Sequence, residues 1–193
     1  MNGSGITNIL KDNIQIVSLI STILLAFIGY IVSYLNNLRI NKRKDRLDYV
    51  NKQLNEFYGP LYVITQSSEI TYEALREVTA KRGNRYINQE APKKKGDLSQ
   101  WEIWLKEVFI PTYDILDKLI IEKSYLIEER DIPDCLNNII AHNAGYKVLI
   151  KNWEKGNFED RKSIVKYADD LAKYAKEKYL KLKQKQTKLI GRN

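Results

Sequence analysis

The sequence predicts an all-α protein, with a single N-terminal transmembrane helix followed by a cytosolic up-and-down helical bundle. Three observations lead to this fold class. No charged residue occurs from Asn13 to Leu38. Beyond that stretch, apolar residues recur at helical spacing over several segments. No segment alternates convincingly between apolar and polar residues, so no sheet is expected.

Residues 13–38 form the predicted transmembrane helix. The apolar run from Ile14 to Leu35 would be about 33 Å long as a helix, which is enough to cross a hydrocarbon core of about 30 Å. A cleaved signal peptide fits less well, because the run lacks a basic region before it and a small-residue cleavage site after it. Residues 1–12 are predicted to be a short, loose extracellular lead-in.

One face of this helix carries small and polar side chains. At 100° per residue, seven such residues fall within an arc of about 80°. They are Gln15, Ser18, Thr22, Ala26, Gly29, Ser33 and Asn36. Small residues at this spacing let membrane helices approach closely. We therefore predict that this face packs against other helices or lines a pore. The alternative is that Ser and Thr simply bond to carbonyls of their own helix.

A basic cluster follows the apolar run directly. It consists of Arg39, Lys42, Arg43, Lys44 and Arg46, with Asp45 as the single acid among them. By the positive-inside rule, this side is cytoplasmic and the N-terminus lies outside, as in a single-pass protein of a bacterial inner (plasma) membrane. We expect these residues to contact anionic lipid.

Residues 39–193 form the predicted cytosolic helical domain. The helix leaving the membrane is expected to run to Tyr58, where Gly59-Pro60 breaks or kinks it. A second helix, over residues 61–79, leads to a long basic loop over residues 81–98, which collects Gly, Pro and charge.

Three further helical segments complete the domain. One begins at a capping box, Ser99 to Glu102, is kinked at Pro111 and ends near Glu129. The next runs from Pro133 to about Lys155, with Leu136, Ile139, Ile140, Val148, Leu149 and Trp153 predicted to be buried. The last is expected to run from about Glu159 to Leu189, with an inner stripe of Ile164, Ala168, Leu171, Ala175 and Leu182.

Composition excludes several kinds of chemistry. The single cysteine, Cys135, excludes an internal disulfide and a multi-cysteine zinc site, and the single histidine, His142, excludes paired-histidine metal sites. Glycine-rich phosphate loops and nucleophile-elbow motifs are absent from the sequence. We therefore predict no cofactor and no metal; a Mg²⁺ or Ca²⁺ site made of carboxylates alone is the alternative that composition leaves open. The net charge of +8 favours an anionic membrane surface over RNA as partner.

His142 is the one side chain whose ordinary pKa lies near neutrality. At helical spacing it shares a face with Asn138 and Tyr146, which is typical of an internal hydrogen-bond network. A catalytic alternative is a HEPN-type ribonuclease motif, Arg-x4-6-His, which Asn137 and His142 match in spacing with Asn in place of Arg. This substitution removes the cation that would stabilise the transition state.

Most of the predicted cytosolic domain resembles a largely uncharacterised family of small bacterial proteins with one N-terminal membrane helix. The residues that carry the resemblance are the run 54–62 (LNEFYGPLY), Trp101, the run 104–109, Pro111, Pro133, His142, Tyr146 and Trp153. It implies a helical fold and a membrane tether, without an established activity. In layout, and in Asn137 and His142, the chain is also similar to the HEPN-like membrane accessory proteins of type VI-B CRISPR systems. That similarity implies an oligomeric, pore-like assembly in antiviral defence.

Three hypotheses follow from these features. The first is a membrane-anchored effector or interaction protein, not an enzyme, that self-associates as a homo-oligomer through its transmembrane helix and defends against phage by perturbing the membrane. The second is a membrane-tethered HEPN-like ribonuclease or RNA-binding domain. The third is a passive membrane adaptor for a protein partner encoded nearby.

Overall fold

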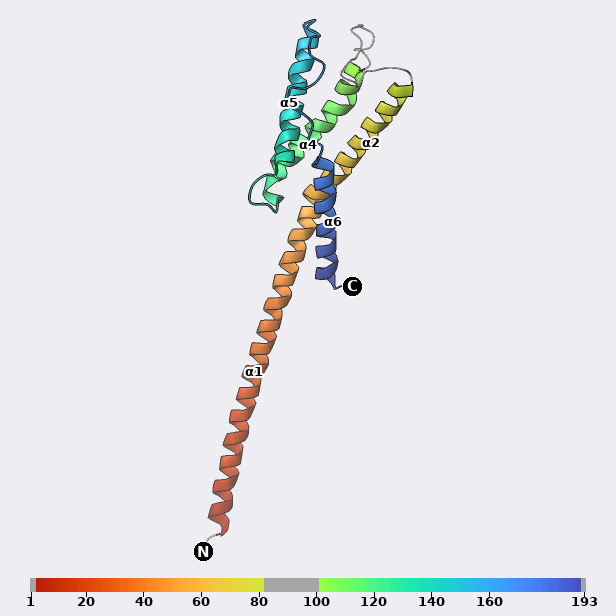
Figure 1. Cartoon of the computed structure of the whole chain (residues 1–193). Helices are drawn as coiled ribbons and strands as arrows, with labels where there is room; N and C mark the ends of the chain where they lie inside the picture. Colours follow the sequence, from red (N-terminus) through yellow and green to blue (C-terminus); the bar gives the residue numbers. More distant parts are fainter. Residues whose placement is uncertain (1–2, 82–100, 192–193) are drawn as a thin grey trace. The chain divides into compact units, whose positions relative to one another are not determined.

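The computed structural model describes residues 3–81 and 101–191, and every regular element in these residues is a helix. This confirms the all-α prediction. The chain divides into two compact units, Met1–Asp48 and Tyr49–Asn193. The helix α1 (Gly3–Gln53) makes up the described part of the first unit and contributes its last turn to the second (Figure 1). Since α1 begins at Gly3, the described part of the predicted lead-in is helical too.

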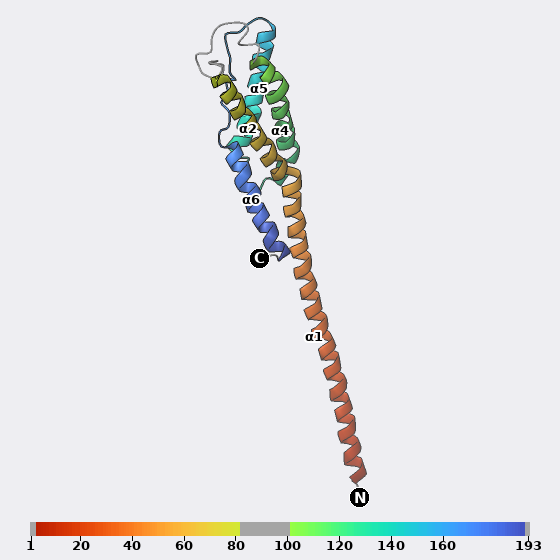
Figure 2. The ribbon, with the colours of Figure 1, turned by 90° about the vertical axis from the view of Figure 1, so that its right-hand side faces the viewer.

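The second unit, which we call the helical domain, contains four further long helices. They are α2 (Gly59–Lys81), α4 (Ile110–Lys123), α5 (Asp134–Glu154) and α6 (Leu171–Ile190). Figures 1 and 2 show α4 beside α5, and α6 beside the start of α2. The predicted loop over residues 81–98 and the capping residue Ser99 lie outside the described residues, apart from Lys81 at the end of α2.

Both predicted proline kinks coincide with a wide, π-helical turn. These turns are Leu54–Tyr58, directly before Gly59-Pro60, and Leu105–Phe109, directly before Ile110-Pro111. A proline ring clashes with the carbonyl four residues earlier in an ordinary α-helix, and the wider turn relieves that clash without ending the helix. The chain therefore stays helical through both prolines. The two turns also share the pattern Leu-x-Glu-x-aromatic-x-Pro.

The core of the helical domain is built from apolar side chains of all its helices. Phe57, Leu61, Leu116, Leu136 and Leu171 are fully buried in it. Tyr72, Trp101 and Tyr113 each pack a ring against Phe109. Burial of this kind stabilises the fold by about 1.5–3 kcal/mol per large side chain.

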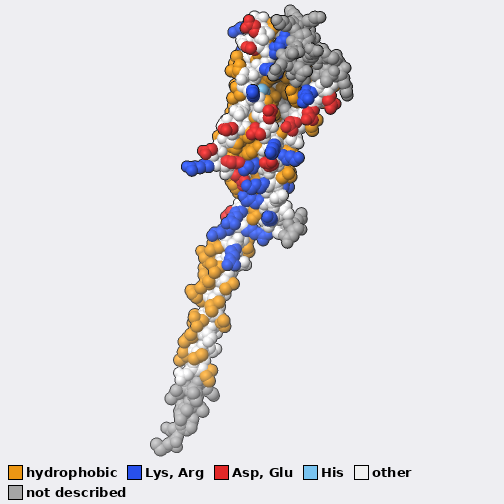
Figure 3. All heavy atoms as spheres, viewed as in Figure 1, with side chains coloured by type: hydrophobic (Ala, Val, Ile, Leu, Met, Phe, Trp, Pro, Cys, Tyr) orange, Lys and Arg blue, Asp and Glu red, His pale blue; other side chains and the backbone are white. Residues whose placement is uncertain are grey.

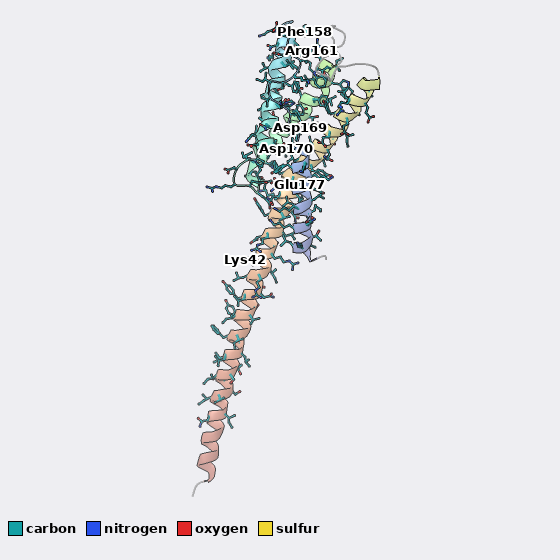
Figure 4. The ribbon with its side chains drawn as sticks, in the orientation of Figure 1. Lys42, Phe158, Arg161, Asp169, Asp170 and Glu177 are labelled. Atoms are coloured by element: carbon teal, nitrogen blue, oxygen red, sulfur yellow. The ribbon has the colours of Figure 1, made fainter. Side chains whose placement is uncertain are left out.

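The predicted last helix is too long, because residues 157–170 are not helical. The segment, which we call the strap, follows Gly156, whose φ of +82° ends α5. Figure 4 shows Phe158 and Arg161 near the end of α5, and Asp169 and Asp170 at the start of α6, so the strap runs back along α5.

Polar side chains, not helical periodicity, hold the strap in place. The indole Nε1–H of Trp153 donates to the carbonyl of Asp160 at 2.8 Å, and the hydroxyl of Ser163 donates to the carbonyl of His142 at 3.1 Å. Gly145 permits this approach, since a Cβ at that position would overlap the Ser163 hydroxyl. Helical spacing alone could not reveal these long-range bonds.

Several apolar residues that helical spacing assigned to the core are exposed. Ile164 lies on the strap and is 90 % exposed, which contradicts the predicted inner stripe. Val148 of α5 is 62 % exposed, and Ile140 is half-buried, whereas the other four predicted α5 residues are buried. Of the last predicted stripe, Ala168, Leu171, Ala175 and Leu182 are buried as expected.

The helix after Pro111 is also shorter than predicted. It ends at Lys123, and a single 3₁₀ turn (Ser124–Leu126) follows it. The amide side chain of Gln53 is fully buried and donates to the carbonyl of Leu126 at 2.8 Å. This bond satisfies a carbonyl that the early helix end would otherwise leave without a donor.

Candidate functional site

The apolar part of α1 is exposed along its whole length. Every described side chain from Ile16 to Leu35 is exposed to solvent in the chain, including Leu25 at 69 % and Phe27 at 62 %. Figure 3 shows this band of apolar side chains. Among the described residues, one helical stretch is long and apolar enough to cross a membrane, and its apolar part is this segment of α1.

The small and polar residues predicted to form a packing face all belong to α1. Because α1 is α-helical throughout residues 13–38, the spacing of the six from Ser18 to Asn36 puts them on one side of it. The hydroxyl of Thr22 donates to the carbonyl of Ser18 at 2.9 Å, so this hydroxyl is satisfied within its own helix. Gly29 differs from the other helical glycines, because a Cβ there would meet nothing within 4 Å. No contact among the described residues therefore explains glycine at this position.

The predicted basic cluster continues the same helix. Arg39, Lys42, Arg43, Lys44 and Arg46 are all exposed on α1, and Figure 4 marks Lys42 there. Two aromatic residues precede Arg39, by nine and five residues. The rings of Tyr30 and Tyr34 stack at a centroid distance of 6.4 Å. Tyrosine followed by a basic cluster is the arrangement found where membrane helices leave the bilayer.

His142 of α5 lies inside the helical domain, and its side chain is 6 % exposed. Its Nδ1 lies 2.6 Å from the carbonyl of Val165 on the strap. Because a carbonyl only accepts, Nδ1 carries the proton, and the neutral ring has its free lone pair on Nε2. Burial lowers the pKa of His142, although the Val165 carbonyl acts in the opposite direction.

Three tyrosine rings surround the His142 ring. The rings of Tyr113, Tyr146 and Tyr167 meet it nearly edge to face, at centroid distances of 5.6, 4.7 and 5.5 Å. Such pairs are worth about 0.5–1.5 kcal/mol each beyond their burial. Burial also raises the pKa of Tyr146 and of Tyr167 to about 12. The ring of His142 thus joins α4, α5 and the strap.

The structure brings only part of the predicted His142 group together. Tyr146 contacts the ring, but Asn138 and Asn137 are exposed on α5. The HEPN-like pair of Asn137 and His142 therefore consists of one exposed side chain and one side chain enclosed by aromatic rings. The other two aromatic contacts, from Tyr113 on α4 and Tyr167 on the strap, were not indicated by the sequence spacing on α5.

Asn143 is the residue that the sequence analysis missed. It is fully buried, and its Nδ2 donates to Asp114 at 2.8 Å and to Asp117 at 2.7 Å, both on α4. Lys147 pairs with Asp114 at 2.6 Å. The Asp114-x-x-Asp117 spacing was the one available signal, since it puts both carboxylates on one face of a helix.

The environments of the two carboxyl groups differ. Hydrogen bonds from Lys147 and Asn143 lower the pKa of Asp114, whereas burial raises the pKa of Asp117. One oxygen of Asp117 and the carbonyl oxygen of Asn143 are buried without a hydrogen-bond partner among the described residues. In the described part of the chain, no three His, Cys, Asp or Glu side chains are grouped as a metal site would require. The cluster connects α4 to α5.

A shallow cavity of about 480 Å³ lies where α6 faces the segment after the 3₁₀ turn. It is lined by Tyr49, Ile127, Glu128, Glu129, Lys178 and Lys181. Its charges are paired within the wall, because Lys178 binds Glu129, and Lys181 lies 4.0 Å from Glu128. Burial raises the pKa of Tyr174, whose hydroxyl donates to Glu129 at 3.3 Å. The cavity wall is an internal ion-pair network.

Comparison with family models, with curated proteins and with solved structures gives no match to this chain. The resemblances drawn from the sequence therefore stay predictions. The group around His142 and the charged residues of the cavity have partners within the chain, and so does the Asn143 cluster apart from one oxygen of Asp117 and the carbonyl oxygen of Asn143. The exposed segment of α1 has none among the described residues, and it is the best candidate for function.

Proposed function

We propose that this chain is a single-pass membrane protein that self-associates through the small and polar face of α1. The helical domain acts as an interaction module on the cytosolic side. The observation that carries this proposal is the combination of a fully exposed apolar helix with one face of small and polar residues. A helix that meets only lipid gains nothing from such a face, whereas helix pairs in membranes use it to bring their backbones together.

Gly29 gives the proposal its sharpest support. Glycine costs about 1 kcal/mol relative to alanine in the middle of a helix. The cost would be unnecessary in an isolated helix, since a side chain at position 29 would enter open space. Close approach of a second helix explains the glycine.

The basic cluster supports the proposed orientation. Arg39, Lys42, Arg43, Lys44 and Arg46 follow the apolar segment, and the lysines and arginines of short flanks orient membrane helices with that flank in the cytoplasm. Tyr30 and Tyr34 then lie at the cytoplasmic interface. Protease added to intact spheroplasts is expected to spare the helical domain, and cleavage of that domain from outside would refute this topology.

Mass measurement of the full-length protein in detergent tests self-association. Light scattering with size-exclusion chromatography is expected to give an oligomer for the native protein and smaller species for Gly29→Leu and Ser33→Leu. Ile31→Leu is the matched control, because it changes an apolar side chain on the opposite face and is expected to leave the mass unchanged. The proposal would be refuted by a monomeric native protein. It would also be refuted if Gly29→Leu and Ser33→Leu both gave an oligomer of the native mass.

The proposed biological setting is defence against phage by perturbation of the membrane. It rests on the predicted assembly and on the layout similarity drawn from the sequence. Cells that express the native chain with its neighbouring genes are expected to resist phage, and Gly29→Leu is expected to abolish the resistance. Full resistance with a monomeric Gly29→Leu variant would exclude membrane assembly as the cause.

A further inference from the structure

The helix α6 runs back towards the point where α1 enters the helical domain. Near its middle, the ring of Tyr179 stacks on Tyr62 of α2 at a centroid distance of 5.1 Å (Figure 2). About two turns later, Nε2 of Gln186 donates to Oδ1 of Asn51, on the last turn of α1, at 2.7 Å. Residue numbers rise along α6 while those of its partners fall, so α6 is antiparallel to them. Its last turn therefore lies at the end of the helical domain that α1 enters, which we call the entry end.

The entry end is also the part of the helical domain nearest to the apolar segment along the chain. Residues 39–48 join the two, and they belong to one continuous helix. At 1.5 Å per residue they span about 15 Å. If the apolar segment crosses a membrane, the headgroup layer takes up about 5–8 Å of this length. The entry end then lies within about 10 Å of the headgroups, a distance close to the Debye length of about 8 Å.

Lysine side chains gather at the entry end. Beyond Glu177, the helix α6 contains lysines and no acidic residue. The exposed ones, which we call the α6 lysines, are Lys181, Lys183, Lys185 and Lys188. Lys52, on the last turn of α1, is exposed as well. The end of α6 therefore presents positive charge where the chain comes closest to the membrane segment.

Contacts within the chain account for only some of these lysines. Glu128 and Glu129 are the carboxylates beside them, and Lys178 and Lys181 already lie against this pair. Lys185 shares Glu128 at 3.2 Å, and Lys183 donates to the neutral amide of Gln186 at 2.7 Å. Lys188 lies in the last turn, where it complements the helix dipole, but that effect fades within one turn. The end of α6 thus keeps a net positive charge.

The opposite end of the helical domain has a different charge. The helix α2 begins beside α6 and leads away from the entry end, and its exposed acidic residues are Glu69, Glu73 and Glu77. Glu77 lies about 27 Å along α2 from Gly59. Between Glu69 and Glu77, Arg76 is the single basic residue. An anionic surface would therefore attract the entry end and repel the far part of α2.

We propose that the α6 lysines contact the anionic leaflet in which α1 is anchored and hold the entry end of the helical domain on the membrane. Ile190, which is 47 % exposed beside them, supplies an apolar side chain that enters the headgroup layer. The inference rests on the membrane-spanning part of the proposed function and not on self-association. A few lysines suffice, because the anchor keeps them at a high effective concentration near the lipid.

Fluorescence quenching of the full-length chain in vesicles tests this contact. A polarity-sensitive probe is attached at Ile190→Cys, and lipids with spin-labelled headgroups serve as the quencher. Quenching is expected to be several-fold stronger in vesicles of phosphatidylglycerol with phosphatidylcholine than in phosphatidylcholine alone, and to fall at high salt. The native thiol of Cys135 is buried and stays in place. Equal quenching in both kinds of vesicle would overturn the proposal.

Val78→Cys is the matched position for the probe. Val78 is 46 % exposed, almost the same as Ile190, and it lies near the far end of α2. A probe there is expected to show little quenching in either kind of vesicle. If the probe at Val78→Cys were quenched as strongly as the probe at Ile190→Cys, the helical domain would not be held by its entry end, and the proposal would be wrong.

Charge reversal tests the lysines themselves. Lys183→Glu with Lys188→Glu is expected to lower the quenching in anionic vesicles to the level seen in phosphatidylcholine alone. Lys166→Glu with Lys173→Glu changes the charge equally at exposed positions near the start of α6, and is expected to leave the quenching unchanged. Thermal unfolding shows whether each variant is folded, and the salt dependence of the native chain tests the contact without any substitution.

Two results of the charge reversal would overturn the proposal. One is undiminished quenching in the Lys183→Glu, Lys188→Glu variant. The other is binding of an RNA oligonucleotide that this variant loses while its quenching stays unchanged, which would assign the lysines to nucleic acid.

The mass of the native protein separates this inference from self-association. If the native protein is monomeric and position 190 is still quenched more strongly in anionic vesicles, the inference stands and self-association fails. If the native protein is an oligomer and the quenching is equal in both vesicles, the inference alone fails. A chain that alkaline carbonate extracts from the vesicles would refute both membrane insertion and this inference.

Discussion

The two units of the chain use glycine for different reasons. In the helical domain, Gly59 and Gly145 lie where a Cβ would overlap a neighbouring atom, the carbonyl of Leu54 in one case and the hydroxyl of Ser163 in the other. In the apolar segment of α1, Gly29 has open space around it. The first two glycines are explained by the fold of the single chain. The third has no contact among the described residues that accounts for it.

The same contrast applies to apolar side chains. Leucines and isoleucines of the helical domain are buried at 0 to 7 % exposure at the core positions, such as Leu116 and Ile139, whereas those of α1 from Ile14 to Ile40 are all exposed. Soluble proteins rarely leave such a long apolar surface uncovered. The comparison teaches that the chain itself covers the described core of the helical domain but not the apolar segment of α1. By our proposal, lipid and other copies of the chain cover that segment.

The largest expected effect tests the glycine contrast directly. Gly59→Ala is expected to destabilise the helical domain by about 3 kcal/mol, because the new Cβ meets backbone of the π-helical turn that cannot move aside. Chemical denaturation of the full-length protein in detergent measures this. Gly29→Ala is the control and is expected to leave domain stability unchanged. Equal stability of Gly59→Ala and Gly29→Ala would contradict the claim that the fold of the single chain requires glycine at position 59 but not at position 29.

The next largest effect is expected on the free energy of unfolding when the His142 ring, which joins α5 to the strap, is removed. His142→Ala removes the bond to Val165 and three edge-to-face contacts, so we expect a loss of about 2 kcal/mol in the free energy of unfolding. Asn138→Ala, at an exposed position on the same helix, should stay within about 0.5 kcal/mol of the native protein. RNA cleavage that is present in the native protein and lost in His142→Ala at undiminished stability would instead support the ribonuclease hypothesis.

A smaller effect is expected at the basic cluster. Each lysine or arginine near an anionic surface contributes about 1 kcal/mol of attraction. Lys42→Ala should therefore weaken the preference of the reconstituted protein for anionic over zwitterionic lipid, as measured by lipid exchange at low salt. Lys147→Ala, which removes a lysine of the helical domain, should leave the lipid preference unaltered. If neither substitution changed the preference for anionic lipid, the basic cluster would not contact lipid.

The smallest effect is the pH dependence that His142 imposes. Burial lowers its pKa in the folded domain below the ordinary value of 6.5, so the unfolded chain binds more protons in this range. Stability should therefore fall as the pH drops below about 6.5 towards the folded pKa, and level off beneath it. His142→Phe should flatten this part of the curve. A native stability that rises on acidification from pH 6.5 would contradict the assigned burial.

Much of the fold could be predicted because it follows from local patterns. The helix α5 lies within one residue of its predicted bounds at each end, because Pro133 directly precedes its first residue and Gly156 follows its last turn. The strap could not be predicted, because its position depends on Trp153, His142 and Gly145 of a helix that precedes it. Asn143 was missed for the same reason, as its partners Asp114 and Asp117 lie on α4. Its burial needs the α4–α5 packing.

The sequence by itself determined the apolar segment of α1, the basic cluster after it and the helical class of the whole chain. These features depend on composition and period, which act over a few neighbouring residues. Only the tertiary structure decided that His142 is enclosed by tyrosines, that Asn137 and Asn138 are exposed and that Ile164 lies on a strap. These outcomes depend on which distant segments meet, and hydrogen bonds between them outweigh local helical preference.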